Sequence, residues 1–145
     1  MLRIFMLLLV AISSAFCQFA VNEIMYNPSG TEPAGEWFEI INISGSDANL
    51  NGWMYSDSGS AASPVVITSA DIIVPAGGYA IIAHSTVPGS PTCDVIIPAT
   101  WRQLNNSGYD GVKLWTPGSI LVESTIYIVT EENCAEDFFC NYLNF

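Results

Sequence analysis

The chain has 145 residues, with 14 acidic against 3 basic side chains and a hydrophobic fraction of 50%. This length suits one domain with a short tail. The aromatic content of 12%, together with many Ile and Val residues, is enough to bury a core, which excludes disorder for most of the chain.

Residues 1–17 are typical of a secretory signal. Arg3 supplies the positive start, residues 4–12 form the apolar run, and small residues at 13–15 lead to the cleavage region. Cleavage after Cys17 would start the mature chain at Gln18, and cleavage at a neighbouring bond fits nearly as well. We therefore expect a secreted, extracellular protein.

Two other interpretations of this segment are weaker. A lipid anchor on Cys17 would need a small residue before the cysteine, and Phe16 stands there. The apolar run is too short to span a bilayer well, and no second run of sufficient length follows. We expect neither a lipoprotein nor a membrane span.

Beyond residue 17, short apolar runs alternate with clusters of Gly, Pro, Asn, Asp and Ser, which punctuate a chain of strands. Strand-length segments at this spacing favour a β-sandwich or barrel. No apolar period of 3.6 residues is sustained over ten residues, so helix should be minor and confined to the acidic tail. The predicted strands are Phe19–Met25, Trp37–Asn42, Leu50–Tyr55, Val65–Thr68, Ile72–Val74, Tyr79–His84, Val95–Ile97, Val112–Trp115 and Ile120–Tyr127.

Two segments predict finer detail. In the strand that starts at Trp37, alternation places Phe38 and Ile40 on a core face and leaves a mixed second face. Between Trp115 and Ile120, Pro117 and Gly118 predict a hairpin turn, with Gly118 supplying the positive φ of the third turn position.

Several motifs in chain order resemble those of the lamin tail domain, of the type found in exported bacterial proteins. The motifs are residues 21–28 (VNEIMYNP), 35–42 (GEWFEIIN), 50–53 (LNGW), 72–79 (IIVPAGGY), 104–108 (LNNSG) and 112–115 (VKLW), and together they cover nearly all of residues 20–127. The resemblance implies an all-β, immunoglobulin-like β-sandwich. Family members occur as tails of nuclear lamins and as accessory modules beside exported nucleases and other hydrolases.

Within these motifs we expect mainly structural roles. Trp53 follows Gly52, whose backbone can turn tightly, and should fill space between the sheets. Residues 75–78 should form a tight turn before Tyr79, and the Asn42 amide should cap the turn after its strand. The predicted structural residues are Trp37, Phe38, Ile40, Gly52, Trp53, Gly78, Tyr79 and Leu114.

The search for catalytic groups is largely negative. His84 is the only conventional base, and it stands at the end of an apolar strand without a nucleophile pattern around it. Glu23, Glu36 and Glu39 would form a carboxylate group if the first two long strands are neighbours, but solvated surface charges explain them as well. We expect no enzyme activity and no required cofactor.

The sequence offers only weak candidates for metal binding and one candidate disulfide. Asp47, Asp57 and Asp110, with Asn49, Asn105 and Asn106, offer oxygen ligands for calcium, but turn formation explains these residues better. Cys134 and Cys140 are close enough to form a disulfide, which would leave Cys93 free. A zinc site at these cysteines is a poor alternative, because the only histidine is distant in sequence.

The predicted organisation is a signal at residues 1–17, a sandwich at 18–127 and an acidic, aromatic tail at 128–145. The tail is a ragged end, an added strand or short helix, or a docking segment for another chain. We expect a non-catalytic structural or interaction module whose partner is a protein or an extracellular ligand. The alternative is an accessory domain of an extracellular nuclease or other hydrolase system, with catalysis elsewhere. Nucleic acid is not an expected partner, because only Arg102 and Lys113 would face 14 carboxylates after signal removal.

Overall fold

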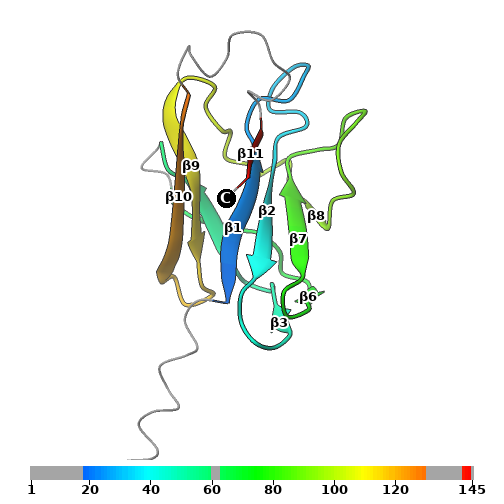
Figure 1. Cartoon of the computed structure of the whole chain (residues 1–145), viewed down its shortest axis with the longest axis vertical. Coiled ribbons are helices and arrows are strands. Elements are labelled where there is room, and N and C mark those ends of the chain that lie inside the picture. The colour runs from blue at the N-terminus through cyan, green and yellow to red at the C-terminus, as the bar shows by residue number, and fades with distance from the viewer. Residues whose placement is uncertain (1–17, 60–62, 130–141, 145) are drawn as a thin grey trace, which may run out of the picture.

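The computed structural model describes residues 18–59, 63–129 and 142–144, and in these ranges the regular structure consists of strands (Figure 1). The strands are β1 (Phe19–Met25), β2 (Trp37–Asn42), β3 (Ala48–Asn49), β4 (Met54–Asp57), β5 (Val65–Val66), β6 (Ile73–Val74), β7 (Tyr79–Ala83), β8 (Val95–Ile96), β9 (Gly108–Trp115), β10 (Leu121–Val129) and β11 (Tyr142–Asn144).

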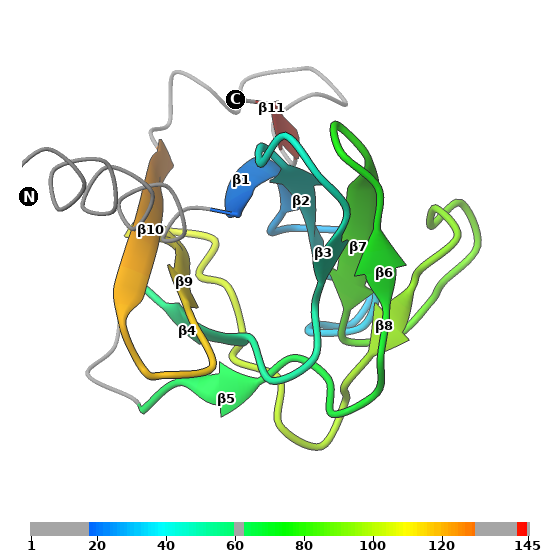
Figure 2. The same ribbon diagram turned by 90° about the horizontal axis from the view of Figure 1, so that it is seen from below.

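Two sheets face each other across a common core (Figure 2). One has five strands in the order β11-β1-β2-β7-β8, antiparallel except for the β7–β8 pair. The other has four antiparallel strands in the order β10-β9-β4-β5, and β3 pairs with β6 as a separate ribbon. This arrangement confirms the predicted immunoglobulin-like β-sandwich.

Alternation along the strands builds the core. Phe38 and Ile40 of β2 are fully buried, as predicted, and Val112 and Leu114 of β9 are buried on the facing sheet. Trp37 lies on the opposite side of β2 and is nevertheless only 6% exposed. The second face of β2 is therefore also covered at its first residue.

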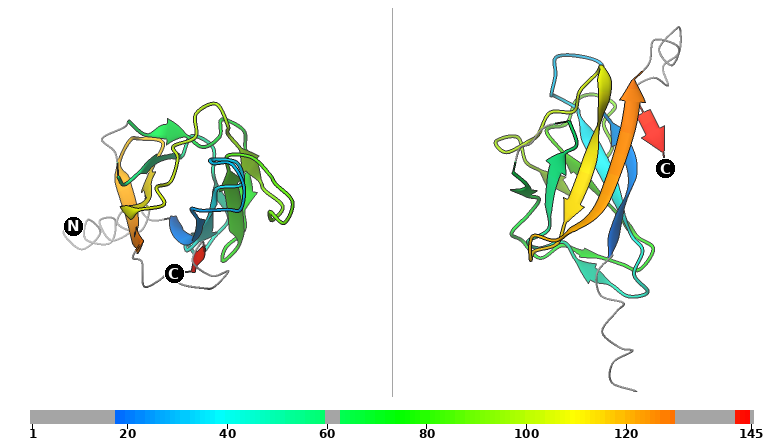
Figure 3. Two further views of the ribbon diagram at one scale, coloured as in Figure 1. Left: turned by 90° about the horizontal axis from the view of Figure 1, so that it is seen from above. Right: turned by 90° about the vertical axis from the view of Figure 1, so that its left-hand side faces the viewer.

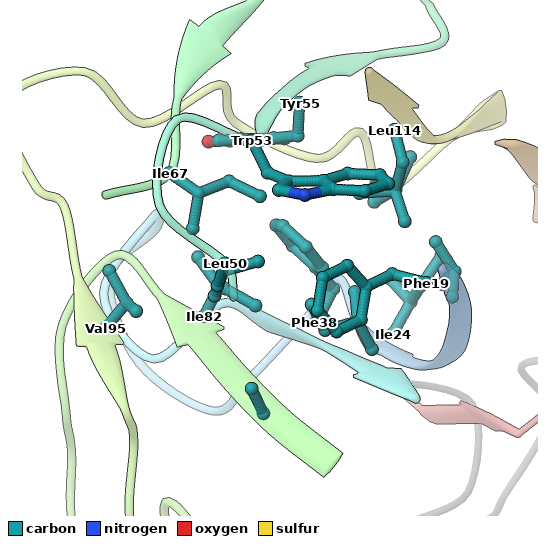
Figure 4. Close-up of a cluster of buried hydrophobic side chains, with 14 of the residues drawn as sticks. Phe19, Ile24, Phe38, Leu50, Trp53, Tyr55, Ile67, Ile82, Val95 and Leu114 are labelled. Carbon is teal, nitrogen blue, oxygen red and sulfur yellow. The ribbon is translucent and has the colours of Figure 1, made fainter. Parts of the chain in front are cut away.

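Aromatic rings fill the space between the sheets (Figure 4). Trp53 is 3% exposed and meets Phe19 edge-on, with ring centroids 4.9 Å apart. Phe38 and Tyr55 contact each other from opposite sheets at a centroid distance of 4.9 Å. Such contacts add to the stability that apolar burial provides.

The predicted strand at 50–55 is shorter in the structure, where β4 begins at Met54. The preceding four residues form a turn in which the Trp53 N–H donates to the Leu50 carbonyl at 3.1 Å. Gly52 has φ of 77° at the third turn position, a conformation that side chains with a Cβ rarely adopt. Trp53 therefore enters the core from a turn, and its burial does not depend on strand alternation.

The hairpin between β9 and β10 forms where predicted, but its detail differs. The Ser119 N–H donates to the Thr116 carbonyl at 2.9 Å, which closes the turn around Pro117. The positive φ falls on Ser119, at 62°, and not on Gly118. A turn followed by one left-handed residue gives a three-residue hairpin loop, which explains the shift.

A second turn, at residues 75–78, closes with a 2.8 Å hydrogen bond from the Gly78 N–H to the Pro75 carbonyl, and Gly77 has φ of 71°. The Asn42 amide secures it, donating to the carbonyl oxygens of Val74 at 2.8 Å and Pro75 at 3.1 Å. The next residue, Tyr79, corrects our expectation of a structural side chain, because it is 53% exposed. Tyr79 pairs with Ile41 on the outer side of the sheet, away from the core.

The tail contributes to the fold. β10 extends to Val129, and β11 pairs antiparallel with β1 between Glu23 and Met25. The added strand of the tail is thus present, while Cys134 and Cys140 lie outside the described residues. In the described part of the chain, no helix has the length and apolar character needed to cross a membrane.

Candidate functional site

Chemically distinctive groups gather at one end of the sandwich, the end where β1 and β4 finish and β2 and β9 begin. It is uppermost in Figure 1, and we call it the upper end. Its central group is Glu36, the residue before β2, which is fully buried. The Glu36 carbonyl accepts a 3.0 Å hydrogen bond from the His84 N–H, which ties the start of β2 to the end of β7.

Only one of the two oxygen atoms of the Glu36 carboxyl group accepts hydrogen bonds. Its Oε2 accepts hydrogen bonds from the Trp101 indole at 2.6 Å and from the Leu104 N–H at 3.0 Å. Its Oε1 is buried and has no hydrogen-bond partner in the described part of the chain. The carboxyl group therefore anchors the long loop between β8 and β9.

This environment raises the pKa of Glu36 from 4.5 to about 7. Burial is the largest cause, because it penalises the charged form. The negative charges of Glu32 and Asp110 raise the pKa further, and the hydrogen bonds from Trp101 and Leu104 oppose the rise. At neutral pH, the folded protein therefore holds a large fraction of Glu36 in the protonated form.

Aromatic packing fixes the same loop. The Trp101 ring lies 5.4 Å from Tyr55 and 5.9 Å from Phe38, measured between centroids. The Tyr55 hydroxyl accepts a 2.7 Å hydrogen bond from the Arg102 N–H. Burial raises the pKa of Tyr55 well above its usual value, so this hydroxyl stays neutral.

A second buried carboxyl group, Asp110, organises the neighbouring loops. Its Oδ1 accepts hydrogen bonds from the N–H groups of Gly59 at 2.8 Å and Gly111 at 2.7 Å, and its Oδ2 accepts one from Asn105 at 2.8 Å. The Ser58 N–H donates to Oδ1 as well, at 3.1 Å. Burial raises the pKa of Asp110, against the lowering effect of these hydrogen bonds.

Stacked tyrosines complete the upper end. Tyr127 stacks on Tyr26 with centroids 4.5 Å apart, and its hydroxyl donates to the Asn105 carbonyl at 2.8 Å. Asn105 is thus held by Asp110 through its N–H and by Tyr127 through its carbonyl. The two buried carboxyl groups and the aromatic rings together hold the loops that close this end.

The predicted carboxylate group forms only in part. β1 and β2 are neighbours, and Glu23 lies directly opposite Glu39 in the register. Glu39 accepts a 2.7 Å hydrogen bond from Asn22, and burial together with the charges of Glu23 and Asp94 raises its pKa. Glu36 does not join this pair, because it points into the upper end.

The calcium candidates are also divided. Asp57 and Asp110 lie at the upper end, and Asp47 lies at the opposite end, where it accepts a hydrogen bond from the Ala76 N–H at 3.3 Å. Among the described residues, no three His, Cys, Asp or Glu side chains gather as metal ligands would. The contacts of Asp47 and Asp110 are those of turn and loop formation.

His84 has a local role in packing. Its Nδ1 lies 2.9 Å from the hydroxyl of the adjacent Ser85, and its ring meets Trp101 edge-on at 6.3 Å. Cys93 is half-buried, and its thiol donates to the Pro91 carbonyl at 3.4 Å.

The sequence interpretation missed the burial of Glu36 and Asp110, although a signal was present. Glu36 stands two residues before Phe38, and Asp110 stands two residues before Val112. Both carboxyl groups therefore share the alternation of the core residues in their strands. Strand alternation therefore directs both carboxyl groups inward. A carboxyl group on the core side of a strand must be hydrogen-bonded or neutral.

The match to known families agrees with this architecture. The family model described as Lamin Tail Domain matches residues 13–128, which includes β1 to β9 and nearly all of β10. No curated protein matches the chain. Since the family model spans most of the chain and the described strands form an immunoglobulin-like sandwich, the chain belongs to the lamin tail domain family.

Proposed function

We propose that the chain is an exported, non-catalytic lamin tail domain that serves as a structural or interaction module. The observation that carries this proposal is that its two fully buried carboxyl groups accept hydrogen bonds from the backbone. Glu36 accepts a hydrogen bond from the Leu104 N–H and Asp110 accepts one from the Asn105 N–H, so both carboxyl groups hold the same loop to the sandwich. A general acid or base must instead reach a proton of the substrate.

Export is supported by the N-terminal pattern of a basic residue, an apolar run and small residues before position 18. The test is intact-mass and N-terminal analysis of the chain secreted by an exporting host, where we expect a start near Gln18. The variant Leu8→Arg interrupts the apolar run and should remain inside the cell. A soluble exported chain that retains residues 1–17 would contradict the proposal.

The non-catalytic role is tested with the purified chain on DNA, RNA and ester substrates. We expect hydrolysis at background for the chain and for its Glu36→Gln variant. Turnover that the chain shows and Glu36→Gln lacks would make Glu36 a catalytic acid. A neighbouring reading frame that encodes a nuclease or other hydrolase would favour the accessory-domain alternative.

We also propose that the loop oxygen atoms of Asp47, Asp57 and Asp110 form turns and do not require calcium. The support is that Asp47 and Asp110 accept hydrogen bonds from backbone N–H groups of the loops. Calcium titration monitored by calorimetry tests this, and we expect no saturable binding.

A partner of the module should be neutral or basic, because the chain carries a net charge of −11.

A further inference from the structure

The middle of the loop between β8 and β9 is attached to the sandwich mainly by hydrogen bonds to acidic side chains. The loop leaves β8 in one sheet and reaches β9 in the other, so it crosses the upper end (Figure 3, left). Within it, each residue from 101 to 106 donates at least one hydrogen bond to a side chain outside the loop. We call residues 101–106 the strap.

Three carboxyl groups accept the hydrogen bonds of five of these six residues. Glu36 and Asp110 together accept those of three strap residues. Glu32, which precedes β2 in the same connection as Glu36, accepts one from the Gln103 amide at 3.1 Å and one from the Asn106 amide. The strap therefore supplies the donors, and titratable groups of the sandwich supply most of the acceptors.

Glu36 is the acceptor that ionisation disturbs most. Its Oε1 is buried, and no hydrogen-bond donor faces it among the described residues, so an ionised carboxyl group would carry part of its charge unsolvated. The charges of Glu32 and Asp110 add repulsion to this burial, and the pKa of Glu36 rises to about 7. The closed strap therefore favours the neutral form of Glu36.

The surroundings of Glu36 are mostly acidic or neutral. Burial raises the pKa of Tyr55 and of Tyr127, so both hydroxyls stay neutral. The Arg102 guanidinium donates to the Ser63 carbonyl at 3.3 Å. The titratable and charged side chains at the upper end are Glu32 and Glu36 before β2, Tyr26 after β1, Tyr55 and Asp57 of β4, His84 after β7, Arg102 of the strap, Asp110 of β9 and Tyr127 of β10. Four of these side chains are carboxyl groups and two are basic.

The strap can lift without unfolding the strands on either side of it. Before it, the Thr100 N–H donates to the Ile97 carbonyl at 3.3 Å, which closes a turn at the end of β8. After it, Gly108 has φ of 72° and can absorb a change in backbone angle. Leu104 is fully buried in the closed strap, so the open form is a minor population.

We propose that the strap is a pH-controlled closure of the upper end, held shut in acid and released more often as the pH rises past neutrality. This inference rests on the loop-holding role proposed above and adds the regulation of the same loop. When the strap lifts, water reaches the Glu36 carboxyl group, which can then ionise. The closed form therefore holds a proton that the open form releases, and a rise in pH favours the open form.

The change in the pKa of Glu36 sets an upper limit on the effect. If opening returns this pKa to 4.5, the open fraction rises by at most about 300-fold over the whole titration and on the order of 50-fold between pH 5 and pH 8. Partial exposure of Glu36 in the open form gives a smaller rise. We therefore expect at least a tenfold rise between pH 5 and pH 8.

Hydrogen exchange followed by NMR on the purified, isotope-labelled chain tests the proposal at these two pH values. Protection factors remove the intrinsic pH dependence of exchange. We expect the protection of the Leu104 and Asn105 N–H groups to fall at least tenfold from pH 5 to pH 8. Gly78, whose N–H closes a turn at the opposite end, should change by less than threefold. Ile40, in the middle of β2, should stay better protected than the strap at both values, because only unfolding of the whole domain exposes it.

Two variants separate the titration of Glu36 from the overall charge. Glu36→Gln keeps an oxygen acceptor and removes the titration, so the protection of the strap should be equal at both pH values. Asp47→Asn is the matched control, because it removes one carboxylate from the opposite end, and it should behave as the unaltered chain does. If Glu36→Gln fails to fold, the comparison of the strap with Gly78 and Ile40 in the unaltered chain still decides the outcome.

Strap protection that is independent of pH, that falls no more than that of Gly78, or that equals that of Ile40 would overturn the proposal. A fall that persists in Glu36→Gln would overturn it as well. The proposed export and non-catalytic role would be unaffected by any of these results, since secretion and hydrolysis test them separately.

Discussion

Replacement of Glu36 by glutamine should change how the stability of the protein depends on pH. Burial raises the pKa of Glu36 from 4.5 to about 7, so the folded state favours the protonated form. A raised pKa contributes stability that is fully present below pH 4.5 and is lost as the pH rises through about 7. The glutamine side chain of the Glu36→Gln variant stays neutral throughout and keeps an oxygen acceptor for Trp101 and Leu104.

The magnitude follows from the size of the pKa change. Each pKa unit corresponds to about 1.4 kcal/mol, so the rise from 4.5 to about 7 corresponds to about 3 kcal/mol. Relative to Glu36→Gln, the unaltered chain should therefore lose about 3 kcal/mol of unfolding free energy between about pH 4.5 and about pH 8.5. The comparison between variants removes the contribution of the other carboxylates, which is common to both.

Urea unfolding at a series of pH values measures this difference, with the midpoint and slope fitted at each pH. Asp47→Asn is the control, because it removes one negative charge from an exposed position. We expect the control to follow the unaltered chain across the range. A Glu36→Gln difference that is flat with pH, or that grows toward acid, would refute the assignment of Glu36 as a buried, partly protonated group.

Other changes test the remaining structural assignments. Trp53→Ala should lower the unfolding free energy by roughly 3–5 kcal/mol, and an unchanged denaturation midpoint with a loss of ligand binding would instead make Trp53 a site residue. Asn42→Ala should cost on the order of 2 kcal/mol, because the buried carbonyl of Val74 loses its donor; thermal melts that match the unaltered chain would show that this contact is dispensable. Peptide mapping under oxidising conditions should link Cys134 to Cys140 and leave Cys93 free, and a link from Cys93 to the tail would reverse that assignment. Mobility-shift titrations should show no binding of duplex or single-stranded DNA at physiological salt, with or without calcium; salt-sensitive binding without calcium would contradict the charge argument.

The sequence by itself determined most of the strands and the class of fold, although it did not predict the short strand β3. Alternation in residues 37–41 placed Phe38 and Ile40 on the core side, and the Pro and Gly clusters located the turns between strands. These signals are local, because a strand repeats every two residues and a turn needs particular backbone angles. They were less reliable for turn detail, as the positive φ at Ser119 and the start of β4 at Met54 show.

Only the tertiary structure decided which of the inward or outward positions are covered. Alternation directs Glu36 and Asp110 inward, but their burial depends on the loop between β8 and β9, which brings Trp101, Leu104 and Asn105 over the upper end. On the outer faces, Trp37 is covered whereas Tyr79 and Ile128 are not. The side on which a residue points is set by its neighbours in sequence, but its burial is set by segments that arrive from far along the chain.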